Sequence, residues 1–482
     1  MDRYHSFGLG ALMLAACLAP SRAVAGLPPE AVELLNRSIA AHATAPAKVR
    51  LLYRGLGSYP DQSSRPEPPF TKHPGEIALA IDEAAGSISF VNEASIDGDF
   101  TFTTRIGFAD GRGYATSYTG EYDLISAFPA AADGILPHRL LKGVLDTATS
   151  GTVTRDRTYD RLSFTALSGA RTLLFDRNTH LLARTIRPPA PSAYGDQVRE
   201  TIYGAYRRVG NAMVPGAVTF RVNSPVLGTT DVNRRLVAAS TEGPRAGELV
   251  PPPGAAQHAA VSRELAIEQL GRDVYLLRNA ATEGQFSYNV LVVVFADQAL
   301  VVEAALNDAT SQKVIAEVAK LAPGKPIRTL VQTHHHADHI GGIRTYIAAG
   351  ATILAPTGLH RLIDRIAAAH SVVAPDALAR SPRPALVEEV GRERIVTAPG
   401  NQVRLYDLPN DHSSHMLVVY LPAERILYQG DLISAGEIPI NDTSRRFLKW
   451  LAAKRLPVDT LAGLHGRTVK GDELRTLLRQ HK

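Results

Sequence analysis

The chain has almost no cysteine: Cys17 is the only one among 482 residues. Cys17 lies in an N-terminal segment that we expect to be removed, so the mature chain would carry no thiol. Disulfides, a cysteine nucleophile and thiolate metal ligands are then excluded.

The chain also lacks a strong charge bias and long apolar runs. It has 52 Lys and Arg against 47 Asp and Glu, which gives a net charge of +5, and no block is rich in basic residues. These features argue against a nucleic-acid partner. After the leader, no apolar run is long enough for a transmembrane helix. Because one hydrophobic core rarely serves a chain of this length, we expect two folded domains.

Residues 1–25 have the pattern of a bacterial signal peptide. The apolar run from Leu9 to Leu18 is followed by Ala23-Val24-Ala25, which fits the small-x-small rule for cleavage. We therefore expect a periplasmic or secreted protein. An alternative remains open, because Leu14-Ala15-Ala16-Cys17 resembles a lipoprotein signal that would anchor the protein through a lipid on Cys17.

Residues 26–241 are predicted to form a β-rich domain. A helix is expected at 29–42 and another near 137–147, and short alternating runs separated by turn signals indicate an antiparallel sheet. The strand pattern of residues 174–184, followed by Met213-Val214-Pro215, resembles that of the half-barrels of periplasmic lipoprotein-carrier proteins. That resemblance implies an open sheet with one concave apolar face, suited to a lipid, a substrate or a lid role.

Residues 242–261 are predicted to be a linker, because Pro251-Pro252-Pro253-Gly254 interrupts a segment with few apolar anchors. Residues 262–482 alternate apolar strands with helical stretches, which is typical of a sheet covered by helices. The chain is thus expected to be α+β, with a β-rich first domain and a second domain in which strands alternate with helices.

Histidine is concentrated in the second domain. Ten of the sixteen histidines follow residue 333. The densest segment, from Thr333 to Gly342, reads THHHADHIGG and follows a predicted strand. Residues two apart on an extended segment point the same way, so His334 and His336 are expected to grip one metal ion. After a turn, Asp338 and His339 are expected to face a second one.

Three further polar residues follow predicted strands in the same way: His412, Asp431 and His465. Open α/β sheets place their functional sites at such strand ends. Because histidine and carboxylates are common ligands of divalent metals, the seven side chains predict a metal site at one edge of the sheet.

In this order the motif H-x-H-x-D-H, then His, Asp and His, resembles the metallo-β-lactamase superfamily over roughly 275–470. The resemblance implies an αββα sandwich. It also implies two metal sites that share one bridging carboxylate. The first would use His334, His336 and His412, the second Asp338, His339 and His465, and Asp431 would join both.

The resemblance further implies a metallo-hydrolase that attacks a small-molecule ester, lactone, thioester or amide-type bond with a metal-bound hydroxide. Two divalent ions are expected, most readily Zn, with Fe or Mn also compatible with this ligand set. Asp338 is expected to assist proton transfer in addition to binding metal.

Two positions depart from the family pattern. In the family a second-layer aspartate is usual at the end of the strand that is predicted here at Ala299–Val302, and in this chain the residue is Glu303. The usual glycine after the third ligand is missing, and His415 there is expected to contact substrate. The remaining His335, His360, His370 and His481 are expected to lie outside the metal shell.

Three alternatives stay open. A mononuclear iron enzyme that oxidises sulfur would use His334, His412 and Asp431. A phosphodiesterase would want a basic channel, and basic residues are not dense between 334 and 431. A lipid- or ligand-binding protein would carry only a vestigial metal site without catalytic function.

Overall fold

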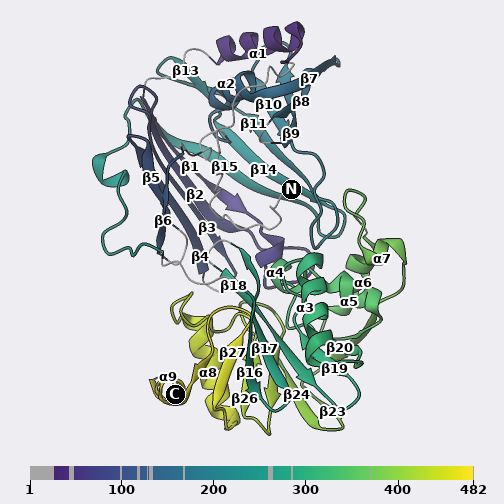
Figure 1. Ribbon diagram of the computed structural model, residues 1–482. Helices are drawn as coiled ribbons and strands as arrows, with labels where there is room; N and C mark the ends of the chain where they lie inside the picture. Colours follow the sequence, from purple (N-terminus) through teal and green to yellow (C-terminus); the bar gives the residue numbers. More distant parts are fainter. Residues whose placement is uncertain are drawn as a thin grey trace.

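The computed structural model describes residues 26–42, 48–97, 100–116, 120–127, 129, 134–166, 169–258, 264–283, 286–369 and 371–480. The predicted signal peptide with Cys17 lies outside the described residues, as do His370 and His481. The chain builds a large curved sheet from its first half and a layered structure from its second half (Figure 1).

The first half forms one antiparallel sheet of 13 strands. Its order across the sheet is β6 (Tyr122–Ile125), β5 (Arg112–Thr116), β4 (Phe100–Ala109), β3 (Ser87–Ile96), β2 (His73–Asp82), β1 (Lys48–Gly57), β15 (Gly228–Ser240), β14 (Ala217–Ser224), β11 (Val198–Gly204), β10 (Leu182–Ile186), β9 (Gly169–Asp176), β8 (Tyr159–Ala166) and β7 (Ala148–Arg155). A small hairpin, β12 (Arg207–Val209) and β13 (Ala212–Val214), stands beside it.

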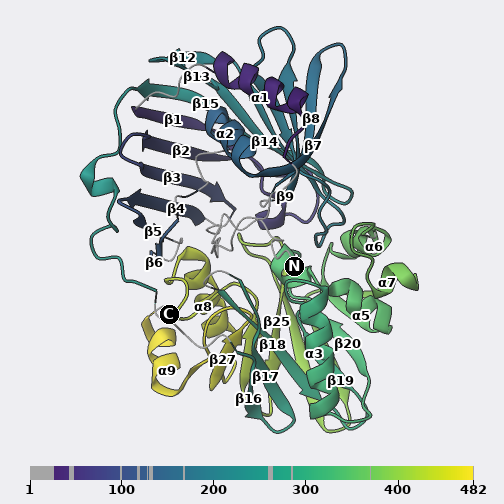
Figure 2. The ribbon, with the colours of Figure 1, turned by 45° about the horizontal axis from the view of Figure 1, so that its top comes forward.

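Two helices, α1 (Pro29–Ala41) and α2 (Pro137–Thr147), pack against this sheet where it curves (Figure 2). Their apolar faces, including Leu35 of α1 and Leu141 of α2, are completely buried in one core with strand residues such as Leu79. Each helix has proline in its first turn, where a missing N–H costs nothing. The predicted likeness to a lipoprotein-carrier half-barrel stays a prediction.

The proline-rich segment after β15 packs along the sheet. Its short helix η3 (Ala246–Glu248) is tied to β1, because Arg50 donates two hydrogen bonds of 2.9 and 2.8 Å to the Glu248 carboxylate. Farther on, Gln257 pairs with Tyr122 of β6 in an isolated bridge. Much of the segment predicted as a linker is therefore held against the first sheet.

The second half contains two sheets that face each other. The first has seven strands: β16 (Ala266–Gly271), β17 (Val274–Glu283), β18 (Phe286–Val294), β19 (Ala299–Val302), β20 (Ile327–Val331), β21 (Thr352–Pro356) and β22 (Leu386–Val390). The second has six: β23 (Glu393–Ala398), β24 (Asn401–Leu408), β25 (Met416–Leu421), β26 (Ile426–Gln429), β27 (Thr460–Gly463) and β28 (Val469–Lys470).

Helices cover the outer faces of both sheets. The seven-stranded sheet is covered by α3 (Asp308–Leu321), α4 (Ala337–Ile340), α5 (Ile343–Ala349), α6 (His360–Ala368) and α7 (Ala377–Arg380), and the other by α8 (Asp442–Lys454) and α9 (Gly471–Gln480). Apolar side chains such as Leu291 and Val419 form the core between the sheets. This arrangement confirms the predicted α+β class and the αββα sandwich.

Among the described residues, no helix has the length and apolarity needed to cross a membrane.

Candidate metal centre

The loop after β20 carries four of the predicted ligands. His334 and His336 lie in its extended part, and Asp338 and His339 lie in α4, which begins at Ala337. Gly341 and Gly342, which follow α4, allow close packing against Leu306 and Ser311. A Cβ on Gly341 would lie 2.1 Å from the Leu306 carbonyl oxygen, so no larger residue fits there without a shift.

The other three ligands are held by side chains that bind the backbone around them. Asn410 accepts hydrogen bonds from the amides of His412 and Ser413, which forms the turn that presents His412. The buried Gln429 side chain accepts from the amides of Leu432 and Ile433 and so shapes the turn at Asp431.

The loop of His465 is fixed in the same way by Asn289 of β18. The Asn289 amide donates to the carbonyl oxygens of Gly463 and Gly466, on either side of the ligand. Four separate strand ends therefore contribute to one cluster.

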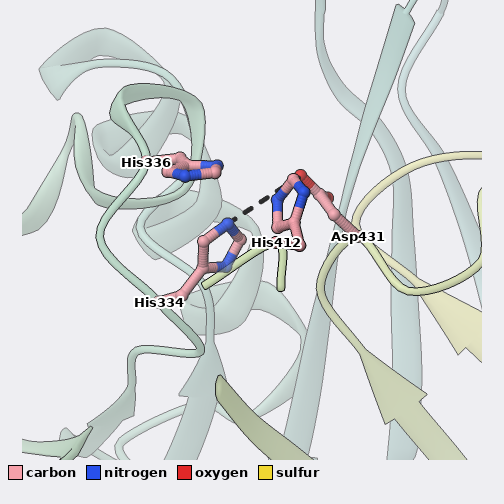
Figure 3. A group of neighbouring side chains, drawn as sticks. All are labelled: His334, His336, His412 and Asp431. Carbon is pink, nitrogen blue, oxygen red and sulfur yellow. Dashed lines mark ion pairs between the residues drawn. The ribbon is translucent and has the colours of Figure 1, made fainter. Parts of the chain in front are cut away.

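The seven side chains fall into two groups that share Asp431. His334, His336, His412 and Asp431 form one, and Asp338, His339, Asp431 and His465 form the other. Within each group the candidate ligand atoms lie within 4.8 Å of one another. Figure 3 shows the three rings of the first group and the Asp431 carboxylate turned toward a common space.

Asp431 lies between the groups by distance as well. Its Oδ2 is 3.1 Å from His412 Nε2 and 3.8 Å from His334 Nε2. Its Oδ1 is 2.9 Å from His339 Nε2 and 3.5 Å from His465 Nε2. Each oxygen of one carboxylate thus faces a different group, which is the geometry of a bridging ligand.

The atoms that face this space suit metal ions. Six buried ligand atoms make no hydrogen bond: His334 Nε2, His336 Nδ1, His339 Nε2, His412 Nε2, Asp338 Oδ1 and Asp431 Oδ1. Leaving a buried polar atom unpaired costs about 1–3 kcal/mol, so six such atoms at one site indicate that a ligand binds there. Divalent ions would satisfy all six, and imidazole nitrogens with carboxylate oxygens suit zinc, iron and manganese.

The opposite ring nitrogens are paired, which fixes the tautomers. His336 Nε2 donates to the Ser63 carbonyl oxygen at 3.0 Å, and His465 Nδ1 donates to that of Ser287 at 3.1 Å. His339 Nδ1 lies 3.1 Å from Glu303 Oε1. Metal-binding histidines usually donate their second N–H to a carbonyl or carboxylate in this way.

Glu303 holds two of the ligands at once. It is fully buried just after β19 and adopts a positive φ of 83°. Its Oε1 accepts from Thr333 Oγ1 at 2.6 Å as well as from His339, and Thr333 Oγ1 in turn contacts His334 Nδ1 at 3.1 Å. The longer side chain therefore fills the role that the family pattern gives to an aspartate.

The electrostatics of the two groups differ. Burial lowers the pKa of His334 and His336 well below the ordinary value, and neighbouring histidines lower it further. Burial also disfavours charge on His339 and His465, but Asp431 and Asp338 outweigh it. The pKa of His465 rises to about 9. His334 and His336 are thus held neutral, whereas the histidines of the second group lie in the stronger negative field.

The two carboxylates are held in their ionised form. Burial alone would raise the pKa of Asp431, but His339 and His465 hold it well below the ordinary value. Asp338 shows the same balance, with His339 and His465 lowering its pKa against burial. Its Oδ2 lies 3.0 Å from His465 Nε2.

The other histidines lie outside the two groups. His415 pairs with Asp407 at 2.9 Å, and about a third of its side chain is exposed, so a contact with substrate remains a prediction. His360 is half exposed at the start of α6, as expected for a surface residue. His335 is buried, and burial lowers its pKa to about 3. Its ring packs beside those of His334 and His336.

Sequence reasoning missed the part that the first half of the chain plays here. The loop of residues 58–72, between β1 and β2, places the Ser63 carbonyl on His336. The same loop carries Asp61, which is buried and interacts electrostatically with Asp338. Burial raises the pKa of Asp61 to about 7 despite Arg199 nearby. No local motif marks this loop, because its contacts join residues far apart in sequence.

Comparison with known proteins finds similarity over part of the chain. Residues 284–468 match the family model of the metallo-beta-lactamase superfamily. A linear primary-alkylsulfatase from Pseudomonas sp. (strain ATCC 19151) is 25% identical over 204 residues, an alignment covering 34% of this chain and 38% of the relative. The chain thus spans about two fifths of that relative.

Among solved structures, a metallo-beta-lactamase from Pontibacter korlensis is 16% identical, with a TM-score of 0.35, and covers 45% of this chain and 99% of its own. A stereoselective inverting sec-alkylsulfatase from Pseudomonas sp. is 18% identical, with a TM-score of 0.35, and covers 45% and 41%.

The second half of the chain is thus an αββα domain with a histidine- and aspartate-rich cluster at the ends of its strands. The match to the metallo-beta-lactamase superfamily model falls within this half of the chain, where the motif indicated it.

Proposed function

We propose that the protein is a dinuclear metal-dependent hydrolase that cleaves an ester, lactone, thioester or amide-type bond of a small molecule. The observation that carries this proposal is the sharing of Asp431 between two ligand groups, together with six buried ligand atoms that make no hydrogen bond. When bound, two divalent ions would supply Lewis acidity and a nucleophile derived from water near neutral pH.

The chain itself contributes orientation and charge. His334, His336 and His412 would hold the first ion, and burial keeps the pKa of His334 and His336 low, so these two rings are neutral. Asp338, His339 and His465 would hold the second in a more negative environment. The Asp338 carboxylate, 17% exposed and 3.0 Å from His465 Nε2, is placed to accept a proton at its Oδ atoms during turnover.

Replacement of Asp431 tests the proposal. We expect the wild-type protein to hold about two zinc, iron or manganese ions per chain. Asp431→Asn should lose at least one of them and most hydrolytic activity, because one neutral amide cannot bridge two cations. Metal content is measured by elemental mass spectrometry, and turnover on a panel of lactones, thioesters and β-lactams.

The control is Asp376→Asn in the same domain. Asp376 pairs with Arg344 and caps α7, away from both ligand groups. That variant should lose thermal stability but keep its metal ions. A wild-type protein with one iron per chain would favour sulfur oxidation instead. A protein that binds no metal after reconstitution would favour a carrier with a relic site.

A second candidate function is hydrolysis of an alkyl sulfate ester. It is favoured by the 25% identity to the linear primary-alkylsulfatase over 204 residues. Release of inorganic sulfate from a primary alkyl sulfate, measured beside the carboxylic ester panel, distinguishes the two. Sulfate release lost in Asp431→Asn would support the second candidate, whereas turnover of carboxylic esters alone would contradict it.

A further inference from the structure

The loop of residues 58–72 reaches from the curved sheet to the metal centre. Ser63 and Ser64 lie against the ligand loop, where Ser63 O accepts from His336 Nε2 at 3.0 Å. The neighbouring Ser64 carbonyl accepts from the amide of Ser414 at 2.6 Å, two residues beyond His412. Two ligand loops of the second half are therefore in direct contact with one loop of the first.

The position of these carbonyl groups is set by Asp97 at the end of β3. Its Oδ2 accepts from the Ser64 amide at 2.6 Å and from Ser63 Oγ at 3.2 Å. Its Oδ1 lies 2.8 Å from His73 Nε2. Burial would raise the pKa of Asp97, but these hydrogen bonds and His73 lower it, so the carboxylate remains charged. Asp97 belongs to the first sheet and is not one of the candidate ligands.

A second contact comes from Tyr194, between β10 and β11. Its hydroxyl donates to the carbonyl oxygen of His335 at 2.6 Å, between the ligands His334 and His336. The Tyr194 side chain is 2% exposed and belongs to the same apolar core as Val290 and Ile340 of the second half. The tyrosine is thus buried in the metallo-β-lactamase domain although its chain position belongs to the β-rich half.

We propose that the β-rich half completes the metal centre, with Tyr194 and Asp97 as positioning residues for His336 and the loop around it. The inference rests on the metal site of the proposed function. Tyr194 fixes the backbone between two ligands. Asp97 fixes the carbonyl that keeps the proton of His336 on Nε2 and leaves Nδ1 free for metal. Such outer contacts typically change metal affinity by about 10–100-fold.

The sharpest test pairs two tyrosines of the same half. Tyr194→Phe removes the hydrogen bond to His335, whereas Tyr53→Phe removes an equally buried bond of 2.7 Å to the Pro215 carbonyl, within the curved sheet. Both full-length variants should lose some thermal stability. We expect Tyr194→Phe alone to weaken Zn²⁺ binding, by about tenfold, in competition with a chromophoric chelator.

A second pair tests Asp97. Asp97→Ala should weaken Zn²⁺ binding and shift the visible absorption of the Co²⁺-loaded protein, because the geometry around His336 changes. Asp97→Asn keeps an acceptor for Ser64 and should restore most of both properties. The matched control is Asp176→Ala, which removes three comparable hydrogen bonds from a hairpin turn at the end of β9.

The tautomer itself can be read without metal. In the metal-free wild-type protein, ¹⁵N-labelled imidazole spectra should show His336 protonated at Nε2, and Asp97→Ala should mix the tautomers. Unchanged Zn²⁺ affinity, Co²⁺ spectrum and tautomer in both Tyr194→Phe and Asp97→Ala would overturn the inference alone. A wild-type protein that binds none of Zn²⁺, Fe²⁺ and Mn²⁺ would overturn the proposed function, and this inference with it.

Discussion

At the scale of single residues, the metal centre depends on side chains that do not touch the metal space. Glu303 is the best example, because its carboxylate accepts from His339 directly and orients His334 through Thr333. One residue therefore sets the tautomer of a ligand in each group. Its positive φ places it where β19 ends, a conformation that only surrounding contacts can maintain in a non-glycine residue.

We predict that Glu303→Ala lowers affinity for the second metal ion by about 10–100-fold, because His339 loses the acceptor that fixes its ring. Glu303→Gln should lose less, since its amide oxygen still accepts from the histidine. Stepwise titration with Zn²⁺ against a chelator separates the two binding events. Two unchanged affinities in Glu303→Ala would show that His339 needs no such support.

The clustering of the candidate ligands could be predicted because their pattern is local. His334, His336, Asp338 and His339 follow one strand in a single motif, and the remaining ligands each stand at a strand end. Their supports could not be predicted in the same way. Ser63 and His336 are 273 residues apart, and a backbone carbonyl leaves no mark on the identity of its residue. The sequence pointed to a carboxylate at Glu303, but its hydrogen bonds to Thr333 and His339 became visible only in the folded chain.

At the scale of elements, α1 is tied to the curved sheet through His42, its last-turn neighbour. His42 Nδ1 donates to the Ser38 carbonyl at 2.8 Å. Its Nε2 lies 3.5 Å from the Leu182 amide and 3.4 Å from Tyr206 Oη. Burial lowers the pKa of His42 to about 4, and the nearby His138 lowers it further.

Because the pKa of His42 is lowered, we predict that the free energy of unfolding falls in mild acid. Because the folded pKa is about 4 and the ordinary value is 6.5, the unfolded chain binds the proton more readily between these values. The contribution is fully present above about pH 6.5 and is lost as the pH falls towards about 4, at a cost of about 3 kcal/mol. Urea unfolding of the wild type and His42→Gln at about pH 7 and pH 4.5 measures it.

The glutamine variant should show a smaller change in the free energy of unfolding between the two pH values, because it has no ring to protonate. An equal pH dependence in both proteins would mean that other groups dominate acid unfolding. A matched substitution, His360→Gln on the exposed start of α6, should leave the pH dependence of the wild type unaltered.

Element boundaries followed from sequence where periodicity was strong. The helix expected at 29–42 is α1 at Pro29–Ala41, and that expected near 137–147 is α2. The proline-rich segment after β15 does not have the structure that its composition predicts. Proline and glycine indicate a free linker, but Arg50 and Glu248, far apart in sequence, join it to β1. Long-range ion pairs of this kind are not visible in a local pattern.

At the scale of the whole molecule, the two halves meet around the ligand loops. Beyond Ser63 and Tyr194, Glu67 of the 58–72 loop pairs with Arg365 of α6 at 3.0 Å. Asp196, after Tyr194, accepts from Ser371 Oγ at 2.6 Å and from the amides of Val372 and Val373. The junction is therefore a set of directed hydrogen bonds grouped beside one site. Loss of metal should therefore weaken the contacts between the two halves.

We predict that removal of metal by a chelator loosens this junction before it disturbs the curved sheet. Without ions, buried ligand atoms of the centre have no hydrogen-bond partner, so the ligand loops should open more often. Bound metal at about a hundred times its dissociation constant would otherwise stabilise the folded chain by about 2.7 kcal/mol. Ser64 and Ser414 report on the junction, because their amides bind Asp97 and the Ser64 carbonyl.

Amide hydrogen exchange, read by mass spectrometry with and without chelator, measures the effect. Exchange should rise in peptides that cover residues 60–66, 334–339 and 411–415, and stay slow in β1 and β2, whose backbone bonds lie within the sheet. Asp431→Asn should show the fast pattern even with zinc added. If chelation instead speeds exchange only in the ligand loops and leaves residues 60–66 protected, the first half of the chain holds its loop in place independently of the metal.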